Sequence, residues 1–290
     1  MNAVGRFIHR VFLFSPYLFL FTPTRAAQAT EYSIKEPFNH SAWDQFLKKY
    51  VNEEGEVNYR GVKENPQLLN AYLKKIHRLE SSVVFTQWPR EEGLALWLNA
   101  YHAALISFVI QHYPLREIND IPGAWDLSIL KMKKEYFSLN DIRASCLIGV
   151  FHDEKIDIAL SCGAKSCPKM RREAFTGPKV EGQLFMIARE FVNNEAYVQV
   201  EPEKSKVEIS QLFDWYGADF KLDFGRAENE KNMNPQVFAV LSFLAHYLED
   251  AGKINFLEEG EYKVKYLPFD WSLNEWVQNV PQTSALPQSK

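Results

Sequence analysis

The chain has 290 residues, 33 of them Lys or Arg and 37 Asp or Glu, which gives a formal net charge of −4 at pH 7. This acidic balance argues against a nucleic-acid partner, because phosphates attract a basic face. Three cysteines are too few for a fold built on disulfides, and the length suits one large domain or two small ones.

The first 29 residues have the three parts of a secretory signal peptide: a basic start, a short apolar stretch, and the small residues Ala27 and Ala29. A membrane anchor is the alternative, but Ser15-Pro16 interrupts the apolar stretch, and a spanning helix needs about 20 apolar residues. We expect cleavage after Ala29, so that the mature protein is exported, periplasmic or extracellular, and has no membrane span. Cleavage removes three of the 33 basic residues and no acidic one, which leaves a net charge of −7.

Three helices are predicted in the first part of the mature chain. Apolar residues recur at helical spacing after Ser41, which can cap the first helix, and again after Asn65-Pro66. The third helix begins at Pro89, and from Leu94 to Ile110 it is apolar on nearly every side. We interpret it as the central buried helix of the domain.

The rest of the chain mixes helices and strands. Helices are predicted from Ser138 to about Val150, over Leu184–Val192 and from Asn234-Pro235 onward, and strands at Lys155–Leu160, Tyr197–Val200, Lys206–Ile209 and Tyr262–Leu267. Because the strands do not alternate regularly with helices, we expect an α+β fold. It would be a mainly helical single domain, residues 30–278, packed on a small, mostly antiparallel sheet, and residues 279–290 would be a disordered tail.

The loop from Ser161 to Pro168 is the segment best suited to chemistry. It holds two cysteines, and it follows a predicted strand that would fix one side of it. Pro168 can occupy the first position of a helix with Cys167 at its N-cap, where the helix dipole lowers the pKa of a thiol from about 8.5. Cys162 and Cys167 are therefore candidate nucleophiles, and Cys167 is the better placed.

A short disulfide between Cys162 and Cys167 is the favoured alternative, since four intervening residues can close such a loop and export provides an oxidising compartment. A metal site is the least favoured, because no His or Cys pair at ligand spacing completes a set of four, and no cofactor is predicted. The third cysteine, Cys146, lies in an apolar run and is expected to be buried and inert.

Asn99 and His102 interrupt the apolar central helix and lie three residues apart on one face of it. A thiol nucleophile needs a base, and His102 is the one histidine whose context points to a site, with Asn99 to orient it. Buried polar groups must find partners, so the pair can also be a structural hydrogen-bond node, and that interpretation is the favoured one.

Five motifs occur in a characteristic order along the chain. They are Leu96–Tyr101, Ser138–Ile142, Ala159–Pro168, Asp214–Tyr216 with Asp219-Phe220, and Asp270–Asn274. Together they resemble the domain of unknown function 547 family over roughly residues 43–274. The resemblance implies a comparison with papain-like thiol enzymes, both for the cysteine motif and for the fold.

The chain departs from the common form of this family at four positions. The family usually has Glu-His where this chain has Arg143-Ala144, and His where it has Asp157. It usually has Asn at the position of His102. If one of the usual histidines is the family's base, either His102 takes over that role here or the chemistry is lost.

The first functional hypothesis is a thiol-dependent hydrolase or acyl transferase. Cys167 or Cys162 attacks a carbonyl, His102 or another histidine acts as base with Asn99 to orient it, and backbone N–H groups after the loop stabilise the oxyanion. A dithiol redox protein is a weaker idea, because the spacing is CxxxxC rather than CxxC.

The second hypothesis is an exported binding or structural domain in which a Cys162–Cys167 disulfide is a covalent staple. Four aromatic residues would then be core or line a groove, and core is favoured: Trp125, Trp215, Tyr216 and Trp271. The patterns predict neither the substrate nor the partner.

Overall fold

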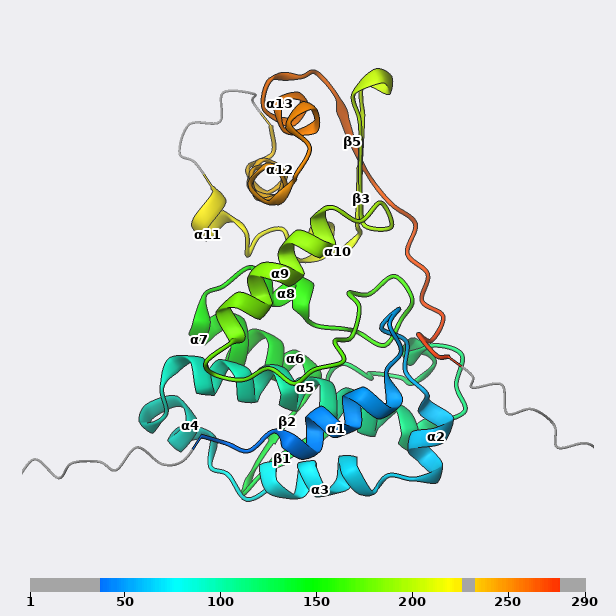
Figure 1. The fold of residues 1–290 in the computed structure, drawn as a ribbon, viewed down its shortest axis with the longest axis vertical. Coiled ribbons are helices and arrows are strands. Elements are labelled where there is room, and N and C mark those ends of the chain that lie inside the picture. The colour runs from blue at the N-terminus through cyan, green and yellow to red at the C-terminus, as the bar shows by residue number, and fades with distance from the viewer. Residues whose placement is uncertain (1–36, 226–232, 277–290) are drawn as a thin grey trace, which may run out of the picture. The chain divides into compact units, whose positions relative to one another are not determined.

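A computed structural model describes residues 37–225 and 233–276, which belong to one compact unit beginning at Lys35 (Figure 1). The predicted signal peptide and the predicted tail lie outside the described residues. Helices predominate in the described part, and short strands form two small sheets. The predicted α+β, mainly helical class is confirmed.

The first five helices all contribute side chains to the apolar cluster around α5. They are α1 Ser41–Tyr50, α2 Tyr59–Glu64, α3 Gln67–Ile76, α4 Ser81–Gln87 and α5 Arg90–His112. In α1 the residues expected to face the core, Trp43, Phe46, Leu47 and Tyr50, are all buried. Ser41 is the first residue of α1 rather than its cap, since its backbone N–H donates to the side-chain oxygen of Asn39 (2.9 Å).

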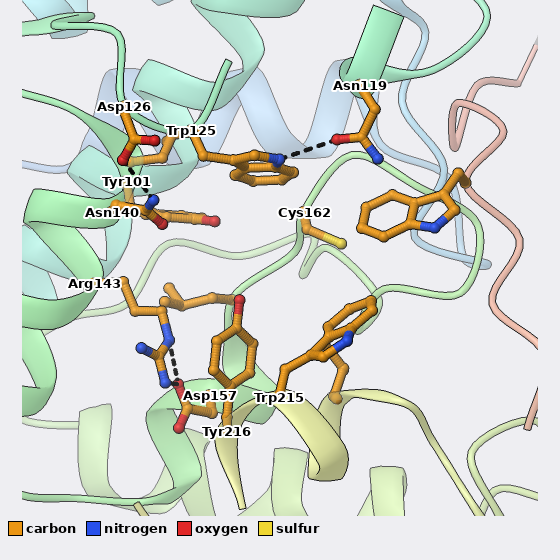
Figure 2. A pocket seen from close by; sticks show the side chains of 14 residues that line it. Tyr101, Asn119, Trp125, Asp126, Asn140, Arg143, Asp157, Cys162, Trp215 and Tyr216 are labelled. Carbon is orange, nitrogen blue, oxygen red and sulfur yellow. Dashed lines mark hydrogen bonds and ion pairs between the residues drawn. The ribbon is translucent and has the colours of Figure 1, made fainter. Parts of the chain in front are cut away.

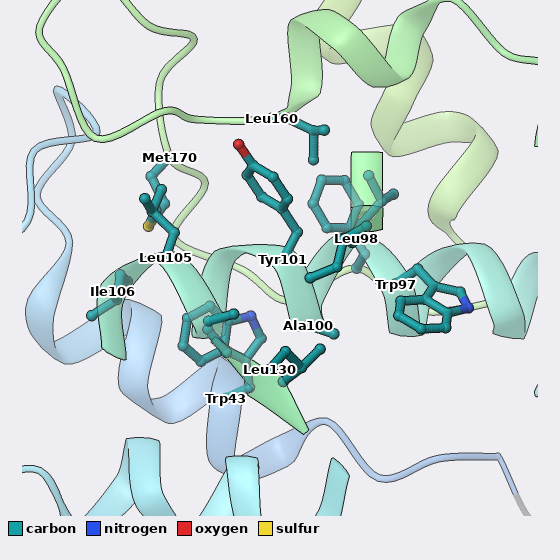
Figure 3. Close-up of a cluster of buried hydrophobic side chains, with 14 of the residues drawn as sticks. Trp43, Trp97, Leu98, Ala100, Tyr101, Leu105, Ile106, Leu130, Leu160 and Met170 are labelled. Carbon is teal, nitrogen blue, oxygen red and sulfur yellow. The ribbon is translucent and has the colours of Figure 1, made fainter. Parts of the chain in front are cut away.

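Helix α5 is the predicted central helix, and 16 of its 23 residues are buried. It is long and apolar enough to cross a membrane by composition, but 89% of its most apolar window is buried inside the protein. Figure 3 shows Trp97, Leu98 and Leu105 of this helix among the side chains of the surrounding core. The burial explains why its sequence has no polar face.

The segment after α5 carries a 3₁₀ turn, a hairpin and a wide helical turn. The elements are η1 Ile118–Asp120, β1 Leu130–Met132, β2 Glu135–Phe137, α6 Leu139–Asp141, the π-helix η2 Ile142–Ile148 and α7 Gly149–Phe151. The helix predicted from Ser138 to about Val150 is confirmed in extent, and Ser138 with Asp141 forms a capping box at its start. Its middle is a π-helix, in which Gly149 N–H bonds to the carbonyl of Ala144.

The strand predicted at Lys155–Leu160 is wrong. Residues Lys155–Ala159 form helix α8, and only Leu160 is extended. The alternation of Ile156, Asp157 and Ile158 is not informative, because all three are buried and the segment has no solvent-facing side. A helical turn starts instead at Asp153, whose side-chain oxygen accepts from Lys155 N–H (3.0 Å).

The second half of the domain has a three-stranded sheet and further helices. They are α9 Val180–Val192, β3 Val198–Glu201, η3 Pro202–Lys204, β4 Lys206–Ile209, α10 Leu212–Tyr216, α11 Lys221–Phe224, α12 Pro235–Tyr247, α13 Ala251–Glu259 and β5 Lys263–Tyr266. The predicted β3–β4 hairpin and the helix opened by Asn234-Pro235 are confirmed. Strand β5 joins β4 in parallel, and β1–β2 is a separate antiparallel pair, so the strands form two sheets rather than one.

Two clusters of buried apolar side chains make up the core. One surrounds α5, and the other contains residues of β3, β4, α10 and α12. Helix α8 contributes to both clusters, because Ile156 belongs to the first cluster and Ile158 to the second. Asp157 between them therefore lies where the two clusters meet, which is also where the cysteine loop begins.

Candidate functional site

The two loop cysteines are joined by a disulfide, Cys162–Cys167, with 5.5 Å between their Cα atoms. Cys167 does not cap a helix: residues 168–171 are not helical, and the next helix is α9, which begins at Val180. The predicted activation of Cys167 by a helix dipole is therefore wrong. Cys146 is a free, buried thiol whose burial raises its pKa to about 12, as expected for an inert cysteine.

The C-terminal part of the described chain holds the cysteine loop in place. Lys165 N–H donates to the carbonyl of Ser272 (2.9 Å), and Asn274 N–H donates to the carbonyl of Gly163 (3.0 Å). Gly163 has φ +79°, a conformation that suits glycine. Two motifs that lie about a hundred residues apart in the sequence are thus paired backbone to backbone.

Asn99 attaches the segment after the loop to the central helix. Its side-chain oxygen accepts from Phe175 N–H (3.0 Å), and its amide nitrogen donates to the Phe175 carbonyl (2.8 Å). The same amide nitrogen lies 3.1 Å from Nδ1 of His40. All of these groups are buried, so Asn99 is a structural anchor.

His102 attaches the start of the loop to the same helix. Ser161 N–H donates to its Nε2 (3.1 Å), while its Nδ1 lies 2.9 Å from the Leu98 carbonyl and must carry the proton. Burial lowers the pKa of His102 to about 4, so the ring is neutral. Asn99 and His102 do not bond to each other: His102 holds the start of the loop at Ser161, and Asn99 holds Phe175 in the segment that follows the loop.

Neither ring nitrogen of His102 is directed at a sulfur atom, because both are engaged by backbone groups. The sulfur of Cys167 instead accepts from Ala164 N–H (3.2 Å). Within the described ranges no hydrogen bond joins a histidine to either loop cysteine, and no group of three or more His, Cys, Asp or Glu side chains could hold a metal ion.

A cavity of about 480 Å³ opens beside Cys162 (Figure 2). It draws residues from α5, α6, the π-helix, α8 and α10, and from the loops around them. The lining residues are Tyr101, Asn119, Trp125, Asp126, Leu139, Asn140, Arg143, Asp157, Leu160, Cys162, Leu212, Trp215, Tyr216 and Trp271. Of the four predicted site residues, only Cys162 lines this cavity.

Arg143 forms a charged group with two aspartates at one side of the cavity. Its Nε donates to Asp157 (2.7 Å) and its Nη2 to Asp219 (2.5 Å), and its guanidinium lies 3.7 Å from the ring centre of Tyr216. Burial raises the pKa of Asp157 well above its usual range, and the charge of Arg143 opposes that rise. Arg143 projects from the π-helix, a distortion that occurs frequently at functional sites.

Three indole rings supply most of the apolar wall. Trp215 and Trp271 stack with their ring centres 5.4 Å apart, and Trp125 donates from its Nε1 to the side-chain oxygen of Asn119 (3.0 Å). Trp215 is 40% exposed. The favoured interpretation of these aromatic residues as core is confirmed only in part: Trp125 and Tyr216 pack against the core clusters, and all four residues line the cavity.

Comparison with known families gives one match. The model described as "Protein of unknown function, DUF547" matches residues 85–192, so over this segment the chain is similar to that family, as its motifs indicate. The match includes α5, the π-helix and the cysteine loop, but not the Trp215 and Trp271 motifs. No curated protein and no solved structure matches the chain.

Proposed function

We propose that this protein is an exported, non-catalytic binding domain that takes a small ligand into the cavity beside Cys162. The N-terminal sequence supports export, and the Cys162–Cys167 disulfide suits an oxidising compartment. The observation that carries the proposal is the cavity itself, in which three indole rings and a few polar side chains converge. Concave, mainly apolar sites with a few placed polar groups are typical of ligand pockets.

The state of the loop favours binding over catalysis. Both sulfur atoms are in a covalent bond, and both nitrogens of His102 are bonded to backbone groups. A thiol enzyme needs a free thiolate and a base within hydrogen-bond reach of it. In the oxidised protein the disulfide instead fixes the wall of the cavity to which Cys162 belongs.

The test uses the mature protein recovered from the compartment to which it is exported. Its intact mass should increase by about two hydrogens on reduction. A thermal-shift screen with a library of small molecules should then find ligands that stabilise the wild type and not Trp215→Ala. Tyr136→Ala is the matched control, because Tyr136 is an exposed aromatic residue (58%) on β2, outside the cavity. A library in which nothing shifts the wild type would refute the binding function.

A thiol-dependent hydrolase or acyl transferase is the second candidate, because the side chain of Cys162 lines the cavity and would be a free thiol there after reduction. The reduced protein is compared with free cysteine for its rate of alkylation by iodoacetamide at neutral pH. We expect no acceleration. Faster alkylation at Cys162, together with ester turnover that Cys162→Ala abolishes, would replace the binding proposal with the enzyme.

A further inference from the structure

No cationic side chain among the described lining residues is free to pair with an anionic ligand. Among the described lining residues, Arg143 is the one Lys or Arg side chain. It already bonds to Asp157 and Asp219, and its guanidinium covers one face of Tyr216. A phosphate or carboxylate would have to displace one of these buried partners, and leaving such a carboxylate unpaired is costly.

The described carboxylates of the cavity are also poorly suited to bind an organic cation. The carboxyl of Asp157 is buried against Arg143, whose positive charge already pairs with it. Asp126 is exposed to solvent, and Asn140 donates to it (2.8 Å). Among the described lining residues no buried carboxylate lacks a cationic partner, although Oδ2 of Asp157 has no hydrogen-bond partner.

The polar groups that remain available are neutral. The hydroxyls of Tyr101 and Tyr216 point into the cavity in Figure 2, and neither has a hydrogen-bond partner among residues 37–225 and 233–276. Tyr101 is only 4% exposed, and burial raises the pKa of both phenols, so each keeps its proton. Neither hydroxyl oxygen is among the buried polar atoms of the described residues that lack a partner, so both are accessible from the cavity, where a ligand can hydrogen-bond to them.

Two amides at the edge of the cavity add one free donor and one free acceptor. The oxygen of Asn119 accepts from Trp125, which leaves its amide N–H groups, and the nitrogen of Asn140 donates to Asp126, which leaves its carbonyl oxygen. A ligand hydroxyl can donate and accept, so it can satisfy either kind of group.

We propose that the ligand is a neutral saccharide whose hydroxyls pair with Tyr101, Tyr216 and the two amides while an apolar ring face lies on an indole. This assignment rests on the proposed binding function and names its ligand class. The stacked Trp215 and Trp271 form one aromatic wall, and Trp125 lies across the cavity from Trp215 (Figure 2). A pyranose has this combination of apolar ring faces and a rim of hydroxyls.

The experiment titrates the oxidised mature protein and records its tryptophan fluorescence, with calorimetry as a second readout. The probes are maltose, cellobiose and N,N′-diacetylchitobiose as neutral disaccharides, tetramethylammonium chloride as a cation, and inorganic phosphate as an anion. We expect saturable binding of at least one disaccharide with a Kd below about 1 mM, and no saturation with the two ions up to about 10 mM.

Variants of the lining residues test whether the disaccharide binds in the cavity. Tyr216→Phe and Tyr101→Phe each remove one hydroxyl and should weaken disaccharide binding about tenfold. Trp215→Ala should weaken it further, and its unchanged melting temperature would show that the fold is intact. Tyr136→Phe, outside the cavity, should bind as the wild type does.

Three other results would contradict the assignment of the ligand as a neutral saccharide bound in the cavity. Failure of all three disaccharides to bind overturns it directly. Binding of tetramethylammonium or phosphate that depends on Trp215 overturns the ligand class but leaves the binding function standing. Disaccharide binding that Trp215→Ala and Tyr216→Phe leave unchanged places the saccharide elsewhere and also refutes the proposal.

Discussion

Two groups of polar side chains belong to the region of the cysteine loop, and they differ in the groups to which they hydrogen-bond. Asn99 and His102, on α5, bond mainly to backbone groups of the segments that they hold, Ser161 and Phe175. Each of these bonds fixes the path of the chain. They leave no free donor or acceptor toward the cavity, which neither residue lines.

The second group surrounds Arg143, whose partners are side chains. Arg143 bonds to Asp157 and Asp219, and the neighbouring Tyr101 and Tyr216 hydroxyls have no partner in the described part of the chain. Side chains that bond to one another beside a cavity fix a local surface more than a chain path. The comparison indicates that the first group maintains the fold and the second presents a binding surface.

The sharpest way to break this comparison is to truncate Asn99 of the first group and, for contrast, Asn140, which lines the cavity beside the second group. Asn99→Ala leaves the buried N–H and C=O of Phe175 without their partner, whereas Nδ1 of His40 keeps the hydroxyl of Tyr72 at 2.8 Å. We expect the free energy of unfolding to fall by about 3 to 4 kcal/mol. Asn140→Ala, at the exposed edge of the cavity, should cost less than about 1 kcal/mol in the same urea titration. Equal losses would contradict the division into two groups.

The ion group can be tested by removing its cation. In Arg143→Met the carboxyl of Asp157, whose side chain is 1% exposed, loses its partner, and we expect a loss of about 3 kcal/mol at pH 8. Without Arg143 the folded-state pKa of Asp157 lies further above its unfolded value. The cost should therefore be small near pH 4 and grow as the pH rises through the folded-state pKa.

The double variant Arg143→Met/Asp157→Asn is the control for this interpretation. It removes the unpaired carboxyl, so urea titrations should show recovered stability at pH 8 and little remaining pH dependence. If the double variant is no more stable than Arg143→Met, burial of an unpaired Asp157 is not the cause of the loss.

Local patterns in the sequence were enough to predict most helices. The spacing of apolar residues identified α1, α3 and α5, and the Asn234-Pro235 pair identified the start of α12. Helix α8 was predicted as a strand because all its sides are buried, and a segment without a solvent face shows no reliable period.

The candidate site was predicted only in part. Asn99 and His102 were visible because they are polar residues in an apolar helix, and the cysteines because of their spacing. The Arg143 group was not visible, because Asp157 and Asp219 follow it by 14 and 76 residues and only the fold brings them together. One signal was present: Arg and Asp stand at two positions where the family usually has Glu and His, so the two replacements could have been interpreted as one new pair.

The buried state of His102 should make stability depend on pH. Its pKa is lowered to about 4 by burial, against an ordinary value near 6.5, so the unfolded chain takes up the proton first as the pH falls. The stability that the neutral ring contributes is present above about pH 6.5 and is lost as the pH falls toward 4. Between pH 7 and 4.5 this amounts to about 2 kcal/mol.

Urea titrations at these two pH values check the prediction. His102→Asn, which removes the imidazole, should remove that part of the difference. His40 is also buried with its pKa lowered to about 4, and it contributes equally in both proteins. His152→Asn is the matched control, because His152 is exposed and its left-handed conformation suits Asn. A difference that persists unchanged in His102→Asn would show that other groups cause it.

The smallest expected effect concerns the π-helix that carries Arg143. A Cβ added at Gly149 would lie 2.8 Å from the carbonyl oxygen of Ala144, whereas one added at Gly182, on the exposed side of α9, meets nothing within 4 Å. Gly182→Ala should therefore stabilise the protein by up to about 1 kcal/mol, since alanine favours a helix. Gly149→Ala should destabilise it by about 1 kcal/mol, because the wide turn must shift to relieve the contact. Thermal unfolding of the two variants measures this difference in stability. Ligand affinity is a second readout. We expect Gly149→Ala to move Arg143 and to weaken binding in the cavity, and Gly182→Ala to leave binding unchanged.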